Sequence, residues 1–214
     1  MCLAEHRFQY EGYEVIPNLI MEAVHLSHLA EKLNIGCGFN VAPMWHPSRM
    51  AEDYAVAGIL TNGRTIFDVA CGYHTREVET FGAPILDQEA NRELFEEQVE
   101  IILKAFHNER FSHKGKHYTL PPEVPYRGYM LKELMLVPRP VYRTHEIWQP
   151  VVSASSRAMD FMIEHARPER GANRRRWPSR RSGRGGRADA GALRETRFVI
   201  RGHGGRADRV SERT

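Results

Sequence analysis

Residues 35–82 read IGCGFNVAPMWHPSRMAEDYAVAGILTNGRTIFDVACGYHTREVETFG, and their pattern decides the fold class. The apolar run at 35–41 contains two glycines, which indicates a strand whose backbone bends or is closely approached. Ser48 can cap a helix that follows, because its hydroxyl can accept a backbone N–H. A second apolar run lies at 65–71. Two strands that begin 30 residues apart with a helix between them predict a βαβ unit and a parallel sheet.

The composition is that of a reduced, water-soluble protein with room for one sizeable core in its 214 residues. The chain has no run of about 18 apolar residues and no basic-then-apolar leader, so we expect a cytoplasmic protein without a membrane partner. Its cysteines, Cys2, Cys37 and Cys71, are unclustered, which favours free thiols over a disulfide framework. The histidine pairs lack a third ligand, so no metal site is predicted.

Charge is unevenly distributed along the chain. Residues 1–166 carry 15 Lys and Arg against 22 Asp and Glu, a net charge of −7. Residues 167–214 carry 15 Arg, no Lys and 5 Asp and Glu, a net charge of +10. This second segment is rich in Gly, Ala and Pro and has no periodicity except at 198–200. We therefore predict an α/β domain over 1–166 and a disordered or non-native Arg/Gly-rich tail over 167–214.

Two explanations for this tail remain open. Its arginines can neutralise phosphates, which would make the chain an arginine-rich nucleic-acid-binding protein. Alternatively, a GC-rich gene read in the wrong frame yields Arg, Gly, Ala and Pro. The absence of Lys among 15 basic residues favours the frame shift. A nucleic-acid partner is expected only if the tail is genuine.

One stretch points to a particular family. HPSRMAEDYAVAGILTNGR at 46–64 precedes an apolar strand and GYHTREVETFG at 72–82. This wording closely resembles the bacterial-luciferase-like family of flavin-dependent monooxygenases, in which a His-Pro loop leads into an Arg-x-Ala-Glu-Asp helix. The close resemblance covers about forty-five consecutive residues, and a looser one extends from Glu5 to about His165.

The resemblance implies a fold and a chemistry. The family fold is a (β/α)8 TIM barrel, of which we expect about strands 2–4 with their helices here, the first strand and helix lying upstream of Met1. The family binds reduced FMN, or a deazaflavin in one branch, and uses molecular oxygen on a small organic substrate. A flavin reductase would supply the reduced flavin, and a homodimer is expected. An inactive fragment and a non-catalytic partner subunit are the alternatives.

The resemblance also implies site residues near the flavin ring. His6 falls on a family histidine implicated in acid–base handling, for which imidazole is suited because its ordinary pKa lies near neutrality. A lone surface histidine is the alternative. The family has a non-proline cis peptide that aligns with Gly38-Phe39, and Asn40 follows at the flavin edge. A plain buried turn would explain these three residues equally well.

Two further groups are implied in cofactor binding. At 71–73 the family carries an arginine before Gly-Tyr, but here Cys71 stands in its place beside Tyr73, which removes a fixed cation from an anionic cofactor. The family's serine-rich junction between a strand and a helix holds the flavin phosphate, and a helix N-terminus favours such an anion. Ser153, Ser155 and Ser156 are the candidates, with simple helix capping as the alternative.

Overall fold

The computed structural model describes most of the predicted domain and a short part of the predicted tail. The described residues are 1–8, 16–30, 32–140, 147–151, 156–166 and 198–202.

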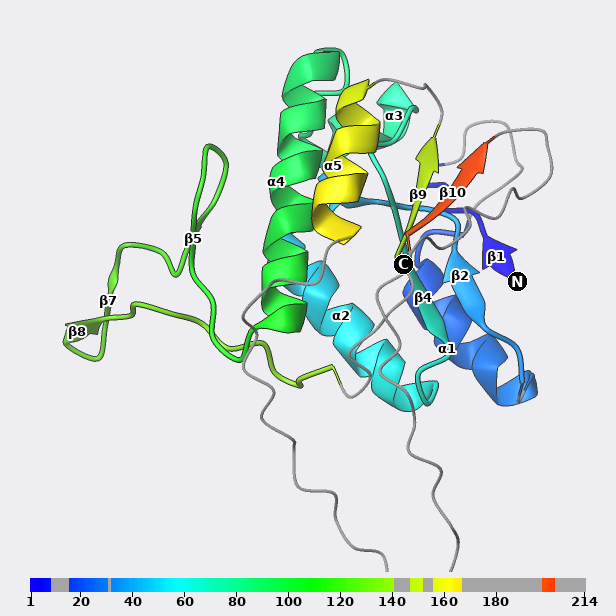
Figure 1. Ribbon diagram of the computed structural model, residues 1–214, viewed down its shortest axis with the longest axis horizontal. Coiled ribbons are helices and arrows are strands. Elements are labelled where there is room, and N and C mark those ends of the chain that lie inside the picture. The colour runs from blue at the N-terminus through cyan, green and yellow to red at the C-terminus, as the bar shows by residue number, and fades with distance from the viewer. Residues whose placement is uncertain (9–15, 31, 141–146, 152–155, 167–197, 203–214) are drawn as a thin grey trace, which may run out of the picture.

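Five parallel strands form one sheet, in the order β1-β2-β4-β9-β10 (Figure 1). The short strand β3 pairs with the end of β4 and adds a sixth member. In the register of β2 and β4, Ile35 lies opposite Thr65, which confirms the parallel βαβ unit. The strands are β1 (Cys2–Leu3), β2 (Ile35–Cys37), β3 (Asn40–Val41), β4 (Thr65–Ala70), β9 (Ile147–Val151) and β10 (Phe198–Gly202).

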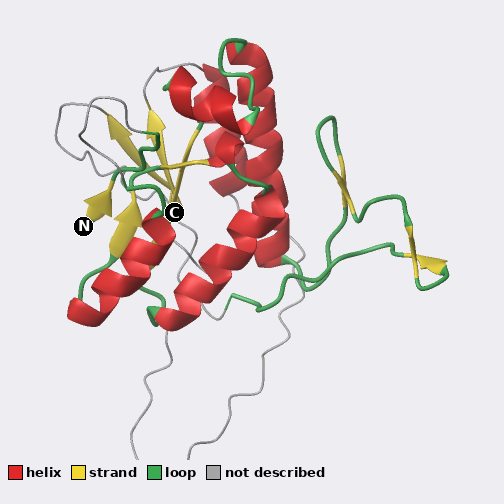
Figure 2. Ribbon diagram, turned by 180° about the vertical axis from the view of Figure 1, so that it is seen from behind, coloured by secondary structure: helices red, strands yellow, loops and turns green. Residues whose placement is uncertain are grey.

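The longer helices pack along one side of this sheet, and α4 and α5 lie side by side (Figures 1 and 2). They are α1 (Leu19–Leu29), α2 (Pro47–Leu60), α4 (Gln88–His107) and α5 (Ser156–Ala166). Short helical turns follow two of the strands: η1 (Ala42–Met44) after β3, and α3 (Thr75–Val78) with η2 (Glu79–Phe81) after β4. No helix among the described residues is long and apolar enough to cross a bilayer.

Aromatic packing between sheet and helices forms the core. Tyr54 of α2 meets Phe67 of β4 edge-on, with ring centroids 4.7 Å apart, and Phe67 meets Phe106 of α4 at 5.6 Å. The side chains of Tyr54 and Phe67 have no solvent exposure. Edge-to-face pairs of this kind add about 0.5–1.5 kcal/mol to the free energy gained from burial.

Two antiparallel hairpins separate α4 from β9. The first joins β5 (His113–Lys114) to β6 (Thr119–Leu120). The alternating residues on either side of Gly115 at 111–120 predict such a hairpin, and the structure confirms it. The second joins β7 (Pro125–Tyr126) to β8 (Tyr129–Met130) and extends away from the body of the protein (Figure 1).

The structure confirms a partial α/β barrel fold and adds detail to the predicted one. The apolar run at 147–152 predicts a further strand, and β9 confirms it, whereas β10 adds a parallel strand that was not expected. Strand β10 lies inside the predicted tail. Ser48 is not the helix cap: α2 begins at Pro47 with His46 as N-cap, since proline has no N–H to satisfy at a first helical position.

A close approach between two strands explains Gly36. A methyl group at this position would lie 2.4 Å from Oδ2 of Asp68, a buried residue of the neighbouring strand β4. We expect Gly36→Ala to destabilise the fold by about 1–3 kcal/mol, because a packed interior does not absorb an added methyl group. The measurement is the free energy of unfolding in urea.

A double-mutant cycle isolates the cause. The cost of Gly36→Ala should fall when Asp68 is replaced by Ala, since the overlapping oxygen is then gone. An equal cost in both backgrounds would contradict the overlap.

Candidate active site

Residues that directly follow three of the strands lie at one edge of the sheet. His6 follows β1, Gly38 and Phe39 follow β2, and Tyr73 follows β4. Neighbouring parallel strands end at the same edge, which is where barrel enzymes place their catalytic groups. Gly72 has a positive φ of 83°, and a Cβ there would lie 2.6 Å from the side chain of Val41, so only glycine allows this turn before Tyr73.

His6 has a polar contact on each ring nitrogen. Its Nδ1 lies 3.1 Å from Oε1 of Glu77, and its Nε2 lies 3.4 Å from the hydroxyl of Tyr73. The His6 ring is edge-on to the rings of Tyr73 and His74. The structure therefore brings together His6 and Tyr73, two of the residues that the sequence predicted for the site.

Glu77 is a buried carboxylate with several donors. It is 2% exposed, and its Oε1 also accepts from the backbone N–H of Arg7 at 3.1 Å and from Arg76 Nη2 at 3.3 Å. His6, His74 and Glu77 each offer a ligand atom within 4.8 Å of the others, so this trio could hold a metal ion. The trio is not apparent from the sequence, because His6 lies 71 residues before Glu77.

A second buried carboxylate anchors the loop after β1. Glu5 accepts from the backbone N–H of Val41 at 2.8 Å and from Arg7 Nε at 3.1 Å. Burial raises the pKa of Glu5, although these donors oppose the shift. The guanidinium of Arg7 lies over the rings of Trp45 and Phe81. The ion pair of Glu5 and Arg7 thus holds the segment that carries His6 against β3 and against the loops that contain Trp45 and Phe81.

The peptide between Gly38 and Phe39 is cis, and both residues are half-buried at the sheet edge. Asn40 is placed differently. It is fully buried, and its Nδ2 donates to the hydroxyl of Tyr54 at 2.6 Å, in the layer between sheet and helices. Its Oδ1 has no hydrogen-bond partner within the described part of the chain. These contacts are typical of a group that joins β3 to α2.

An arginine from another element stands beside Cys71. Arg92 of α4 places Nη1 3.7 Å from the Cys71 sulfur, while its Nε donates to Glu96 at 2.6 Å. Burial raises the pKa of Cys71 to about 11, and the nearby guanidinium acts in the opposite direction. Helix α4 therefore places a cation near the position where the family motif has its own arginine.

The predicted phosphate site is only partly described. Ser153 and Ser155 lie outside the described residues, and Ser156 is the exposed first residue of α5. The neighbouring Arg157 pairs with Glu96 at 2.8 Å and with Glu89, both on α4. Ser156 is thus the first residue of α5, and the ion pairs of Arg157 hold this helix against α4.

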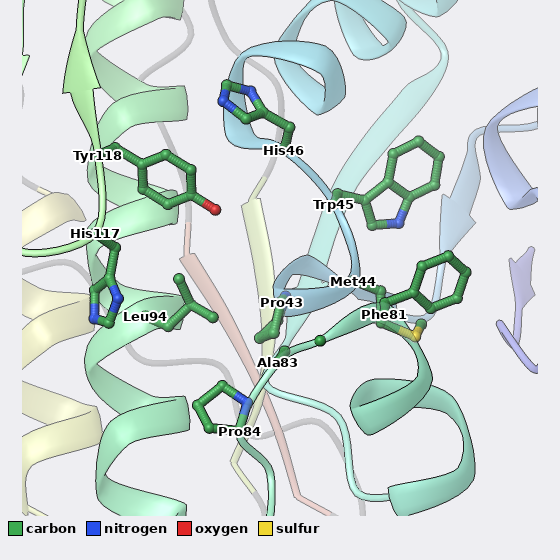
Figure 3. A pocket seen from close by; sticks show the side chains of 11 residues that line it. Pro43, Met44, Trp45, His46, Phe81, Ala83, Pro84, Leu94, His117 and Tyr118 are labelled. Carbon is green, nitrogen blue, oxygen red and sulfur yellow. The ribbon is translucent and has the colours of Figure 1, made fainter. Parts of the chain in front are cut away.

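A cavity of about 580 Å³ is lined in part by Trp45 and Phe81, the two rings that the Arg7 guanidinium covers (Figure 3). Tyr118, Leu94 and His117 stand on one side, facing Trp45, Met44 and Phe81 on the other. The walls come from η1, the segment after η2, α4 and the β5–β6 hairpin, and are mostly apolar and aromatic. Burial lowers the pKa of His46 at the rim, so its imidazole is neutral near pH 7. None of the described residues after position 120 lines this cavity.

Comparisons with known proteins give a consistent picture. A family model described as luciferase-like monooxygenase matches residues 1–169. The oxygenase component of a flavin-dependent trigonelline monooxygenase from Acinetobacter baylyi is 26% identical over 110 residues, which cover 51% of this chain and 30% of that protein. The chain therefore spans about a third of that relative's length.

Solved structures show the same fold. The oxygenating constituent of 3,6-diketocamphane monooxygenase from Pseudomonas putida, in complex with FMN, is 20% identical with a TM-score of 0.59, over 77% of this chain and 44% of that one. A monooxygenase from Streptomyces bottropensis is 18% identical with a TM-score of 0.59, over 73% and 43% of the two chains.

The thiols of buried Cys37 and half-buried Cys71 are expected to resist alkylation. Burial raises the pKa of Cys37 to about 12 and that of Cys71 to about 11, so at pH 8 few of either are thiolate, whereas Cys2 is exposed. We expect iodoacetamide to modify Cys2 first, as seen by peptide mass spectrometry. In Arg92→Leu the pKa of Cys71 should rise further and its alkylation should slow. Faster alkylation of Cys71 in Arg92→Leu would contradict the contact in which the Arg92 guanidinium lowers the pKa of Cys71.

Glu97 of α4 attaches the hairpin that forms one cavity wall. It accepts from the backbone N–H groups of His117 and Tyr118 at 2.9 and 2.8 Å and contacts Nε2 of His113 at 3.0 Å. Burial alone would raise the pKa of Glu97, but these partners together hold it below the ordinary 4.5. The attachment is therefore present above pH 4.5 and is lost as pH falls through the lower, folded-state pKa.

We expect Glu97→Gln to accelerate hydrogen exchange of the His117 and Tyr118 amides at neutral pH and to abolish the acid-induced release. NMR measures both. Glu89→Gln is the control, since Glu89 is exposed on the same helix and forms its ion pair with Arg157 of α5 rather than with the hairpin. Equal effects of the two variants would show that Glu97 does not attach the hairpin.

Proposed function

This chain belongs to the luciferase-like monooxygenase family, and we propose that it is a flavin-dependent monooxygenase acting with reduced flavin and molecular oxygen on a small organic substrate. The observation that carries the proposal is the placement of His6, the Gly38-Phe39 peptide and Tyr73 at one edge of parallel strands in a chain of this family. A bound reduced flavin would supply the electrons that activate oxygen.

The residues at this edge suit a flat, partly apolar cofactor. Gly38, Phe39 and His6 are partly accessible and Tyr73 is exposed, so a ring system can contact them without disturbing the core. We propose that Gly38, Phe39 and Tyr73 contact the ring, with Cys71 nearby, and that His6 holds or moves a proton beside it. Asn40 would support this edge from the helix side of the sheet, where its Nδ2 donates to the hydroxyl of Tyr54.

A buried cation suits the phosphate of the cofactor. Nη2 of Arg92 is buried and has no hydrogen-bond partner among the described residues, so it can donate to an anion near the start of α5. We propose that Arg92 serves in place of the arginine that Cys71 replaces, together with Ser153, Ser155 and Ser156 at the strand-to-helix junction. FMN is the proposed cofactor, and a deazaflavin, which also carries phosphate, is the alternative.

The neighbouring cavity suits an apolar substrate. Trp45 and Phe81 line it and also pack against Arg7, which follows directly after His6. We propose that the organic substrate enters here, because aromatic walls bury apolar surface and leave few polar groups unpaired.

The proposal extends to partners and domains. The relative from Acinetobacter baylyi is called an oxygenase component, which supports a separate flavin reductase as the source of reduced flavin. We propose a homodimer in the cytoplasm, with residues 1–166 forming the flavin-binding part and 167–214 a separate Arg/Gly-rich segment.

Flavin binding tests the proposal directly. We expect FMN to bind the purified chain saturably, with quenched flavin fluorescence and a raised melting temperature. Arg92→Leu should weaken FMN binding about tenfold or more, because a hydrogen bond to a charged group contributes about 1.5–3 kcal/mol. A parallel titration with a deazaflavin decides between the cofactors.

Arg49→Leu is the matched control, since Arg49 is an exposed cation on α2 that pairs with Glu52 and Asp53. No change in fluorescence or melting temperature with either cofactor would refute the proposed function. Equal losses in both arginine variants would refute the role of Arg92.

A further inference from the structure

We propose that Glu77 is a positioning residue that holds His6 in the tautomer with the proton on Nδ1, so that Nε2 exchanges a proton with Tyr73. The inference rests on the proposed function, because it assigns a direction to proton transfer at that site. Neither Glu77 nor the order of the three groups follows from the chain's sequence.

The first step concerns Nδ1 of His6. A carboxylate only accepts hydrogen bonds, so the 3.1 Å contact with Glu77 Oε1 requires the proton on Nδ1. Glu77 is itself immobilised: its side chain is buried, the Arg7 backbone N–H donates to it at 3.1 Å, and Arg76 donates at 3.3 Å. The position of Glu77 therefore sets the orientation of the His6 ring.

The second step concerns Nε2. With the proton on Nδ1, Nε2 carries the lone pair and accepts from the Tyr73 hydroxyl, 3.4 Å away. When Nε2 takes up a proton, the imidazolium forms an ion pair with Glu77, as a buried carboxylate does for the histidine of a catalytic triad. Tyr73 is 72% exposed and so joins His6 to whatever occupies the edge of the sheet.

Other groups around His6 fit this assignment better than a metal site. The guanidinium of Arg76 is 3.3 Å from the Glu77 oxygen and opposes a dication there. That oxygen already faces three N–H groups. The His74 ring is edge-on to His6, with centroids 5.2 Å apart, and limits rotation of the His6 ring.

The test reads the tautomer of His6 without any cofactor. Two-bond and three-bond ¹⁵N–¹H correlations of the labelled full chain at neutral pH distinguish the two neutral forms. We expect the Nδ1–H form in the native protein. In Glu77→Leu, which keeps the side-chain volume but removes the acceptor, the Nε2–H form should dominate. Glu79→Gln, an exposed change in the next turn, should leave the native pattern.

Glu77→Gln covers the case in which the leucine variant does not fold. The amide oxygen can still accept from Nδ1–H, so the tautomer should persist while the ion pair with imidazolium is lost. Turnover should then fall about a hundredfold or more, the contribution of a general acid–base group, while the FMN dissociation constant stays unchanged. Failure of FMN binding in every variant would instead bear on the proposed function.

Three results would overturn the inference. They are the Nε2–H form in the native protein, an unchanged tautomer in folded Glu77→Leu, and turnover in Glu77→Gln equal to that of the native chain. Titration with Zn²⁺ alone adds a fourth: stoichiometric binding that His74→Ala abolishes would make the trio a metal site.

Discussion

Parallel pairing of β1, β2 and β4 is the constraint on which the candidate site depends. Because all three strands run the same way, the segments that leave them emerge at one edge, and residues far apart in sequence come into contact there. His6 and Glu77 meet across 71 positions for this reason. The pairing in turn needs the close approach at Gly36, where any side chain would overlap the carboxylate of Asp68.

Local patterns made much of this fold predictable. The βαβ unit, the helix that Asp87 caps and the β5–β6 hairpin all follow from periodicity and turn residues, which act over a few neighbouring positions. The predicted start of α2 was two residues too late, because Pro47 occupies the first helical position and His46, not Ser48, is the N-cap. The parallel pairing of β10 with β9 joins segments some fifty residues apart, and no local signal fixes such a partner.

The site was predictable only where the family motif names a residue. His6 and Tyr73 stand in the motif, and the structure brings them together. Glu77 lies in the same quoted stretch, but its importance depends on which side chain it faces, and that is a property of the assembled sheet. Glu5 and Arg92 were missed for the same reason. Their charges matter because burial makes an unpaired charge costly, so each must be matched by a partner that only tertiary structure supplies.

The proposed role of Arg92 would meet from helix α4 a requirement that the family motif meets at position 71. An arginine on the strand end would be rigid, whereas Arg92 reaches the same region from α4, with its guanidinium stacked over Phe95 and Phe161. Its Nε donates to Glu96 and its Nη1 lies beside the Cys71 sulfur, while the buried Nη2 has no hydrogen-bond partner among the described residues. Under the proposed function, Arg92 thus moves the cation to α4 rather than removing it. The packing of α5 on α4 would then support the proposed site, because Phe161 and Arg157 of α5 contact Arg92 and Glu96.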